Sequence, residues 1–268
     1  MTTALIVGTG SLPRALTLAM PDRPLIAAFD PFTPEGVNVD LRFRIERLGP
    51  FLRDLQDRGV TRVAFAGAIQ RPRLDPALID PFTADLLPPL IAAMRGGDDG
   101  ALRAVLAIFE DAGFAIAGVG DLAPDLLPAA GFLHGHATPT DTADAARAAT
   151  IVAALGAVDV GQGAVVQQGL CLAVEALAGT DAMLRSVASL PNMLRPDAAQ
   201  GKGVFYKAAK PGQDLRIDLP TLGPGTLHLA AAAGLAGIAW QAGHVICLDP
   251  PAMTTLAAEL GLFLWSRP

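Results

Sequence analysis

Between positions 207 and 223 the chain gathers charged side chains just ahead of an alanine-rich apolar segment. Two lysines, one arginine and two acids fall within this stretch: Lys207, Lys210, Asp214, Arg216 and Asp218. Lysine and arginine donate hydrogen bonds to phosphate, a helix N-terminus adds backbone N–H donors, and a carboxylate can hold a divalent cation against phosphate oxygens. The segment therefore predicts a site for a polyanionic ligand. The plain alternative is a solvated strand and turn with ordinary surface charges.

Glycine-rich turns follow two predicted strands in the first half of the chain. Gly8-Thr9-Gly10 follows an apolar run and precedes a helical pattern with Pro13 in its first turn. This context suits a turn that approaches phosphate, but Pro13 stands where the dinucleotide-binding fingerprint has its third glycine. The second turn contains Arg71, whose guanidinium could bind phosphate or pair with the nearby Asp75. Gly10 and Arg71 are candidate binding residues on this basis.

Three further groups of polar residues lie at predicted element ends. They are Asp98, Asp99 and Arg103 at one helix start, Gln162 between two glycines, and Gly179-Thr180-Asp181 at another helix start after Glu175 ends a strand. Acids and hydroxyls at a helix start often only cap it, so a structural role is open at each position. Backbone N–H groups and a hydroxyl at such a start can also face an anion. Glu175 is expected to be either exposed at its strand end or buried with a partner.

The elements that position these residues alternate between strand and helix. Strands are expected at residues 4–7, 24–29, 62–66 and 114–118, with helices between them, which predicts a parallel sheet with helices on both faces. The later half predicts a helix at 140–155, a hairpin of two strands over 163–175, and further strands and helices to the end of the chain. The fold class is therefore α/β with two domains. We expect an N-terminal Rossmann-like domain at 1–130, a linker at 131–139 and a C-terminal mixed α/β catalytic domain at 140–268.

Composition narrows the class of function. The chain has 268 residues, a net charge of −6 and no basic stripe, so a nucleic-acid partner is not expected. No signal peptide and no apolar run of membrane-spanning length is recognisable, which predicts a cytoplasmic protein; peripheral contact with a membrane face is left open. Cys171 and Cys247 lie in apolar runs and are expected to be buried thiols in strands rather than a disulfide or zinc site.

Taken together, the segments around these residues resemble one family. The resemblance rests on stretches that begin at Gly8, Phe65, Gly97, Asp159, Glu175 and Lys207, the last reaching Asp218-Leu-Pro220-Thr221-Leu-Gly223. Their order and spacing are similar to the LpxI-type UDP-2,3-diacylglucosamine diphosphatases of lipid A biosynthesis, over nearly the whole chain. Two positions depart from the family pattern: Thr9 replaces a common glycine and Ala209 a common proline. Neither departure removes a charged group.

The resemblance implies a reaction and a set of functional residues. Water would attack the α-phosphorus of UDP-2,3-diacylglucosamine to give UMP and 2,3-diacylglucosamine 1-phosphate (lipid X), with Mg²⁺ or another divalent cation such as Mn²⁺. It also implies a homodimer, and contact with the inner face of the inner membrane is left open. Asp218 is the implied catalytic residue and metal ligand, or else it orients the water. The candidate substrate-binding residues are Gly10, Arg71, Asp98, Asp99, Arg103, Gln162, Gly179, Thr180, Asp181, Lys207, Lys210 and Thr221.

Two other functions compete with this interpretation. One is a nucleotide-sugar or lipid-phosphate binding protein without catalysis. The other is a Rossmann-type oxidoreductase, which Pro13 disfavours, although Asp30 stands about twenty residues beyond the glycines, where such enzymes place a ribose-binding acid.

Overall fold

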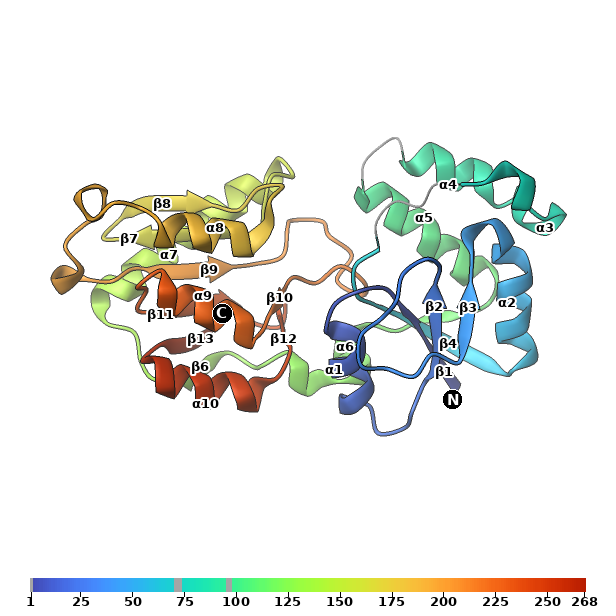
Figure 1. The fold of residues 1–268 in the computed structure, drawn as a ribbon, viewed down its shortest axis with the longest axis horizontal. Coiled ribbons are helices and arrows are strands. Elements are labelled where there is room, and N and C mark those ends of the chain that lie inside the picture. The colour runs from blue at the N-terminus through green and yellow to red at the C-terminus, as the bar shows by residue number, and fades with distance from the viewer. Residues whose placement is uncertain (1, 70–73, 95–97) are drawn as a thin grey trace. The chain divides into compact units, whose positions relative to one another are not determined.

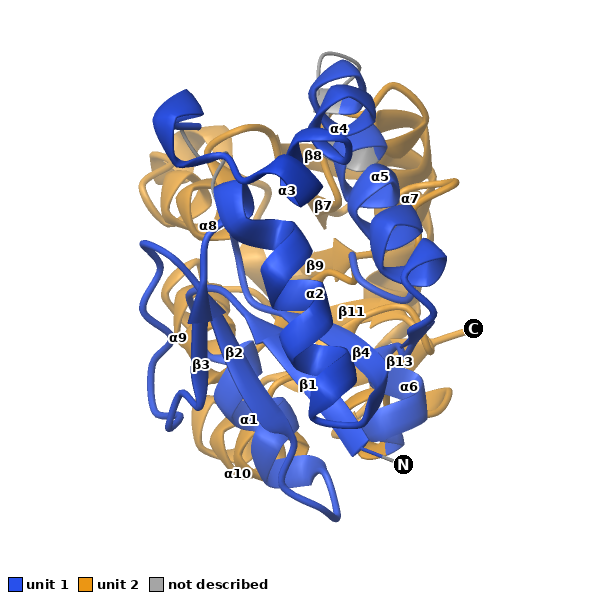
Figure 2. Cartoon of the chain, turned by 90° about the vertical axis from the view of Figure 1, so that its right-hand side faces the viewer, with its two compact units in different colours: residues 1–124, 216–218 blue, residues 125–215, 219–268 orange. Residues whose placement is uncertain are grey.

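The computed structural model describes residues 2–69, 74–94 and 98–268, which form two compact units. Unit 1 comprises Met1–Pro124 together with Arg216–Asp218, and unit 2 comprises Asp125–Leu215 and Leu219–Pro268. Figure 2 shows the two units in different colours. The short segment 216–218 is thus part of unit 1 although the chain on either side of it belongs to unit 2.

Unit 1 is built around a five-stranded parallel sheet in the order β3-β2-β1-β4-β5. The strands are β1 (Thr2–Val7), β2 (Leu25–Phe29), β3 (Leu41–Phe43), β4 (Val60–Ala66) and β5 (Ala115–Ile116). The helices are α1 (Leu12–Ala19), α2 (Leu48–Asp57), α3 (Pro81–Ala84), α4 (Leu87–Met94), α5 (Asp98–Asp111) and α6 (Val119–Leu122). Short 3-10 helices lie at η1 (Ile45–Arg47) and η2 (Pro76–Leu78).

Helices cover both faces of this sheet because successive strand residues point to opposite sides. Ala4 and Ile6 of β1 pack in one core with Phe51 of α2 and Phe109 of α5. Leu16 of α1 is fully buried, and Figure 1 shows α1 and α2 on opposite sides of the sheet. The Rossmann-like part of the predicted fold class is confirmed.

Unit 2 contains a six-stranded mixed sheet in the order β6-β13-β11-β9-β7-β8. Its strands are β6 (Gly131–His134), β7 (Gly163–Gln167), β8 (Leu170–Val174), β9 (Val204–Lys207), β11 (Gly237–Gln241) and β13 (Phe263–Arg267). A two-stranded sheet adds β10 (Thr221–Leu222) and β12 (Ile246–Cys247). The helices are α7 (Pro139–Ala157), α8 (Gly179–Ala188), α9 (Pro224–Ala232) and α10 (Pro250–Leu260), with 3-10 helices η3 (Pro124–Leu126), η4 (Asn192–Leu194) and η5 (Ala198–Gln200).

The strands β9, β11 and β13 are parallel, whereas β6, β7 and β8 are antiparallel to their neighbours, so the mixed α/β class is confirmed for this half. Helix α7 packs on one face of the sheet, where Val152 meets Tyr206 in a shared core. Helices α8, α9 and α10 pack on the other face, around Phe205 and Trp240 (Figure 1). Residues 131–139, the expected linker, contain strand β6 and the start of α7.

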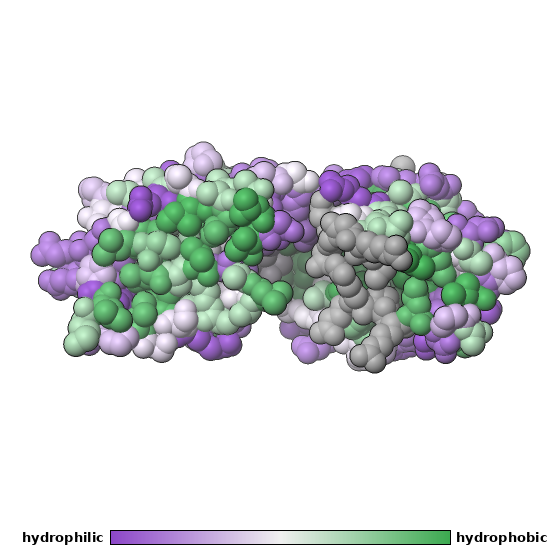
Figure 3. Space-filling model, turned by 90° about the horizontal axis from the view of Figure 1, so that it is seen from above, coloured by the Kyte–Doolittle hydropathy of each residue, from purple (hydrophilic) through white to green (hydrophobic). Residues whose placement is uncertain are grey.

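The outer strand β8 exposes much of its apolar sequence. Leu170 is 59% exposed and Val174 39%, and the loop that follows exposes Leu177 fully. Figure 3 shows hydrophobic residues gathered on the face of unit 2 in view. Cys171 is also exposed, so the expectation of a buried thiol was wrong there, because an outer strand lacks a neighbour to cover it. Cys247 is buried as expected, and burial raises its pKa to about 12.

No helix among the described residues is long and apolar enough to cross a membrane.

Candidate active site

A buried lysine ends strand β9, in the middle of the unit 2 sheet. All four residues of β9 are buried, and the Lys207 side chain is only 7% exposed. Its amine donates a hydrogen bond to the Thr180 hydroxyl and lies 3.7 Å from Oε2 of Glu175. The Thr180 hydroxyl in turn donates to the same Glu175 oxygen at 3.0 Å. The three side chains therefore form one closed polar network at the carboxyl end of a central strand.

Burial disfavours the charged form of the Lys207 amine. Burial lowers the pKa of the Lys207 amine, while the carboxylates of Glu175 and Asp181 act in the opposite direction but with smaller effect. Removing an ammonium group from water is costly unless it is paired and hydrogen-bonded. Glu175 is itself mostly buried, with 12% of its side chain exposed. Of the two alternatives for Glu175, the structure has the buried carboxylate with a partner.

Two glycines create the space for Glu175. Gly163 of β7 lies directly opposite Lys207 in the strand register, and a Cβ there would approach Oε2 of Glu175 to 2.7 Å. A Cβ on Gly161 would collide with the Glu175 backbone carbonyl. A larger residue at 163 would push the carboxylate away from Lys207, and one at 161 would displace the Glu175 backbone. The Gly161-Gln162-Gly163 sequence is therefore required by the close approach of the Glu175 segment.

Helix α8 begins beside this network. Gly179 adopts a φ of 81°, in the left-handed region that favours glycine, and Thr180 follows as the hydroxyl that contacts both Lys207 and Glu175. Asp181 forms an exposed ion pair with Arg185 at 3.3 Å, one turn along the same helix. Thr180 thus points into the network, whereas Asp181 pairs along its own helix.

A second cluster fixes the loop that follows β9. The Lys210 amine lies 2.6 Å from Oδ1 of Asp159, a residue with a φ of 56° in the turn after α7. The Gln213 side-chain oxygen accepts hydrogen bonds from the backbone N–H of Lys210 at 2.9 Å and from Nε2 of Gln162 at 3.0 Å. Asp159 is 77% exposed, so its contact with Lys210 is open to displacement by an incoming anion.

The segment with Asp218 belongs to unit 1. Arg216 forms an ion pair with Glu110 of α5 at 2.7 Å, and a Cβ on Gly118 would lie 3.2 Å from the Arg216 Cα atom. Asp218 is partly buried, and its side chain makes no hydrogen bond or ion pair with the described residues of that unit. Its carboxylate is therefore available within the unit to bind a ligand.

The remaining predicted site residues are dispersed. Gly10 is exposed, with a φ of 91° in the turn after β1, and Arg103 is exposed on α5. Asp98 and Asp99 begin α5, and Arg71 lies outside the described residues. Thr221 lies in β10 of unit 2, paired with Ile246. The structure therefore brings together Thr180 with Lys207, and Gln162 with Lys210 through Gln213, but places Gly10, Arg103 and Asp218 in unit 1.

Sequence reasoning missed three members of these clusters as site residues. The sequence predicts Glu175 only as an acid at a strand end, and neither Asp159 nor Gln213 is among the predicted site residues. The sequence signal for Glu175 is the pair of glycines at 161 and 163. Glycines in or beside a strand indicate that another segment approaches the backbone closely, and here that segment contains Glu175. Local spacing does not predict the Asp159–Lys210 and Gln162–Gln213 contacts, because each joins residues 51 positions apart.

Among the described residues, no three His, Cys, Asp or Glu side chains gather into a group that could hold a metal ion by themselves. Mg²⁺ commonly binds through only one or two carboxylates, with substrate phosphates and water completing its shell. A single available carboxylate such as Asp218 fits that pattern.

Comparison with known proteins covers almost the whole chain. Residues 2–126 match the model of the LpxI N-terminal domain, and residues 129–265 match that of the LpxI C-terminal domain. A curated protein of Caulobacter vibrioides, named UDP-2,3-diacylglucosamine pyrophosphatase LpxI, is 43% identical over 221 residues. The alignment spans 82% of this chain and 79% of that relative.

Proposed function

The chain belongs to the LpxI family, and we propose that it is an enzyme that hydrolyses UDP-2,3-diacylglucosamine in lipid A biosynthesis. The observation that carries this proposal is the 43% identity to the Caulobacter pyrophosphatase across 82% of the chain. The buried polar network at the end of β9 supports it, because burying a lysine and a glutamate side by side in a core is costly and calls for a functional reason.

We propose attack by water on the α-phosphorus. The water oxygen forms a bond to that phosphorus, and the bond from the same phosphorus to the bridging oxygen breaks. The bridging oxygen leaves with the lipid half, so the products are UMP and 2,3-diacylglucosamine 1-phosphate (lipid X). The water supplies the oxygen that UMP gains, and its protons pass to solvent or to a base.

The charges of unit 2 suit the diphosphate. Lys207 and Lys210 carry positive charge at the end of β9 and in the loop after it, and Thr180 offers a hydroxyl at a helix N-terminus. Such donors, already held in place, stabilise charge that develops on phosphate oxygens during attack. Glu175 acts as a positioning residue, because its carboxylate fixes both Lys207 and Thr180.

Asp218 is the proposed catalytic residue. Its carboxylate would either bind a divalent cation, Mg²⁺ or Mn²⁺, or hold the attacking water. A bound cation would offset the negative charge of the diphosphate. The partly buried and available carboxylate supports both roles.

The test is hydrolysis by the purified full-length protein. With Mg²⁺ we expect release of UMP from UDP-2,3-diacylglucosamine, and chelation of the cation with EDTA should stop it. In heavy-oxygen water the label should enter UMP; label in lipid X would contradict attack on the α-phosphorus. Tight binding of the substrate without any product would instead favour the alternative, a nucleotide-sugar or lipid-phosphate binding protein.

Homodimer formation, a cytoplasmic location and contact with the inner face of the inner membrane are part of the same proposal. The exposed apolar side chains of Leu170, Val174 and Leu177 support contact with an apolar partner. Sedimentation of the purified protein measures its mass in solution, and flotation with lipid vesicles measures membrane contact. A monomeric mass would contradict the homodimer, and protein that stays in the aqueous fraction would contradict the membrane contact.

A further inference from the structure

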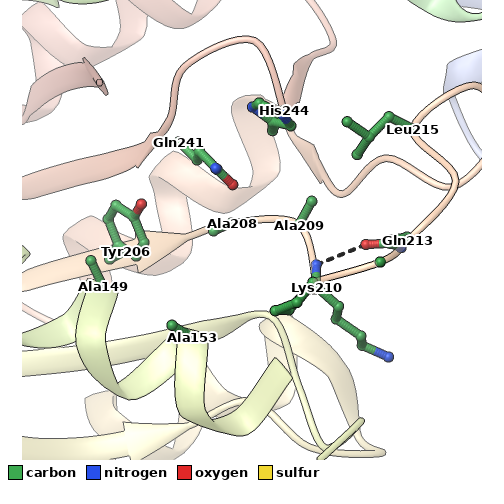
Figure 4. A pocket seen from close by; sticks show the side chains of 12 residues that line it. Ala149, Ala153, Tyr206, Ala208, Ala209, Lys210, Gln213, Leu215, Gln241 and His244 are labelled. Carbon is green, nitrogen blue, oxygen red and sulfur yellow. Dashed lines mark hydrogen bonds between the residues drawn. The ribbon is translucent and has the colours of Figure 1, made fainter. Parts of the chain in front are cut away.

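The loop after β9 leads from unit 2 into unit 1. Within unit 2 this loop lines a cavity of about 330 Å³ beside the ends of β9 and β11, together with helix α7 (Figure 4). The hydrogen bond from the Lys210 backbone N–H to the Gln213 side chain, drawn in Figure 4, holds the loop there. Three residues later the chain belongs to unit 1, from Arg216 to Asp218, and it returns to unit 2 at Leu219.

Two fixed points lie on either side of Asp218 along the chain. Two residues before it, Arg216 forms an ion pair with Glu110 near the end of α5, with 2.7 Å between Nη1 and Oε1. Two residues after it, the Pro220 carbonyl accepts a hydrogen bond from the backbone N–H of Ile246 at 2.9 Å. The position of the Asp218 carboxylate therefore depends on Glu110 on one side and on β12 on the other.

Glu110 stands where its charge is unfavourable for its own helix. Residues 108–111, the last turn of α5, include two acids and no basic residue. The C-terminal end of a helix carries a partial negative charge, so the helix dipole repels a carboxylate there. The Glu110 side chain is 45% exposed, so it does not serve the core of the unit. A role for its charge outside the helix, at Arg216, accounts for its position.

A glycine makes room for the Arg216 backbone. Gly118 has a φ of −84° and a ψ of 170°, an extended conformation that any residue adopts, so its conformation does not call for glycine. A Cβ at this position would lie 3.2 Å from the Arg216 Cα atom, closer than ordinary van der Waals contact. The backbone N–H of Gly118 is itself fixed by a hydrogen bond to the Asp121 carboxylate at 2.9 Å. The Arg216 backbone thus packs at close range against a fixed turn.

We propose that Glu110 is a positioning residue for the reaction, which sets the location of the Asp218 carboxylate through Arg216. This inference rests on the proposed function, because it takes Asp218 as the catalytic residue. An exposed ion pair adds little to stability. Turnover is more sensitive to geometry, since a misplacement of about 1 Å can cost about 10²-fold in rate. Glu110 therefore matters much more to turnover than to folding.

Glu110→Gln tests the proposal, because it removes the charge and keeps the shape of the side chain. The control is Asp54→Asn, which breaks another exposed ion pair of unit 1, between Asp54 and Arg58, at a similar carboxylate exposure of 43%. We expect kcat for UDP-2,3-diacylglucosamine to fall about 10–100-fold in Glu110→Gln with KM unchanged, and to keep its wild-type value in Asp54→Asn. The free energy of unfolding, measured by urea titration, should change little in Glu110→Gln, because relief from the helix dipole offsets the lost ion pair.

Double variants show whether Glu110 acts through Arg216 and Asp218. When Arg216→Gln is already present, adding Glu110→Gln should lower kcat no further, and the same should hold for the residual rate of Asp218→Asn. Gly118→Ala crowds the Arg216 backbone and should also lower kcat with KM unchanged. Trypsin digestion gives a readout that needs no activity: cleavage after Arg216 should be faster in Glu110→Gln than in the wild type, because the segment is held less firmly.

Other results overturn the proposal. An unchanged kcat in Glu110→Gln would remove this residue from the reaction, and a raised KM at constant kcat would assign the ion pair to substrate binding. A full further loss of rate when Glu110→Gln is added to Arg216→Gln would mean that Glu110 acts independently of Arg216. Wild-type protein that hydrolyses the substrate while its variants show any of these results retains the proposed function and loses this inference. Wild-type protein that hydrolyses nothing loses the proposed function, and equal cleavage after Arg216 in both forms would then overturn the inference as well.

Discussion

The two units end their central strands in different ways. In unit 1 the turn after β1 and the turn after β4 bond to each other through the backbone, with N–H···O distances of 2.9 and 3.0 Å between Thr9 and Ala68. In unit 2 the ends of β9 and β11 instead carry a buried ionic network on one face and a cavity on the other. The glycine-rich turn after β1 is therefore held in place by backbone pairing with the turn after β4. In unit 1 these turns pair with each other, whereas in unit 2 the strand ends and the loop after β9 carry the charged side chains of Lys207, Glu175 and Lys210.

Asp218 is the exception to this contrast, because it is the proposed catalytic residue and it belongs to unit 1. Its substitution is expected to have the largest effect of those predicted. Asp218→Asn keeps the shape of the side chain but removes its charge, so it can neither bind the cation as before nor accept a proton. We expect kcat to fall by about 10²–10⁴-fold, the range for loss of a catalytic acid or base, with substrate binding retained. Steady-state assays and calorimetry measure the two quantities.

The control for Asp218 is Asp57→Asn, which removes an exposed carboxylate at the end of α2 in the same unit. It should leave kcat unchanged. Equal kcat in Asp218→Asn and the wild type would remove Asp218 from the chemistry and leave unit 2 as the source of every reactive group.

The second effect concerns the buried network. Lys207→Met leaves Glu175 buried without its partner, which typically costs about 3–5 kcal/mol. We expect a large drop in the free energy of unfolding, measured by urea titration, together with loss of activity. The double variant Lys207→Met, Glu175→Gln should recover much of the stability and none of the activity.

Recovery of activity in the double variant would mean that the lysine charge serves the fold alone. The network would then resemble the closed turns of unit 1, and the contrast between the units would disappear.

The third effect compares one glycine from each unit. A Cβ on Gly8 would meet the Ala68 carbonyl, and a Cβ on Gly163 would meet the Glu175 carboxylate. Both Gly8→Ala and Gly163→Ala should destabilise the protein by about 1–3 kcal/mol through overpacking. Only Gly163→Ala should also lower kcat per folded molecule, because it displaces the group that fixes Lys207 and Thr180. Gly225→Ala, with open space around its Cβ position, serves as the neutral control.

The smallest effect is a pH dependence. The pKa of Lys207 is lowered by burial below its ordinary value of 10.5. Between the two values the unfolded chain holds a proton that the folded protein has released, so stability should rise with pH in that window. The slope cannot exceed about 1.4 kcal/mol per pH unit for one group. The free energy of unfolding, measured by urea titration at several pH values, is compared between the wild type and the Lys207→Met, Glu175→Gln variant. The difference between the two proteins isolates the contribution of Lys207, and a difference that falls as pH rises would contradict the lowered pKa.

Periodicity in the sequence predicts most of the fold, because long elements repeat their pattern. The hairpin predicted over 163–175 is present as β7 and β8, and it turns at Gln168 and Gly169, which both have positive φ. Strand β3 was missed because its three residues, Leu41–Phe43, lie in a polar stretch too short to show alternation. Strand β6 was missed because Gly131 and the neighbouring histidine and proline residues indicate a loop, whereas pairing with β13 makes it a strand.

The site could be predicted only as separate pieces. Local spacing identified Thr180 and Lys207 individually, but their contact joins positions 27 residues apart and depends on how β9 and α8 pack. The exposure of Cys171 was missed for a related reason, since the position of β8 at the sheet edge is a property of the whole sheet. The sequence gives the type of each side chain, whereas the order of the strands in the sheet decides which side chains are in contact.

The membership of Arg216–Asp218 in unit 1 has a consequence for how the protein is made. Residues 216–218 leave the ribosome only after most of unit 2 has been synthesised. A gene cut after residue 124 would therefore place Arg216 on a different chain from Glu110, its ion-pair partner in unit 1. Synthesis of both units on one chain makes that contact intramolecular.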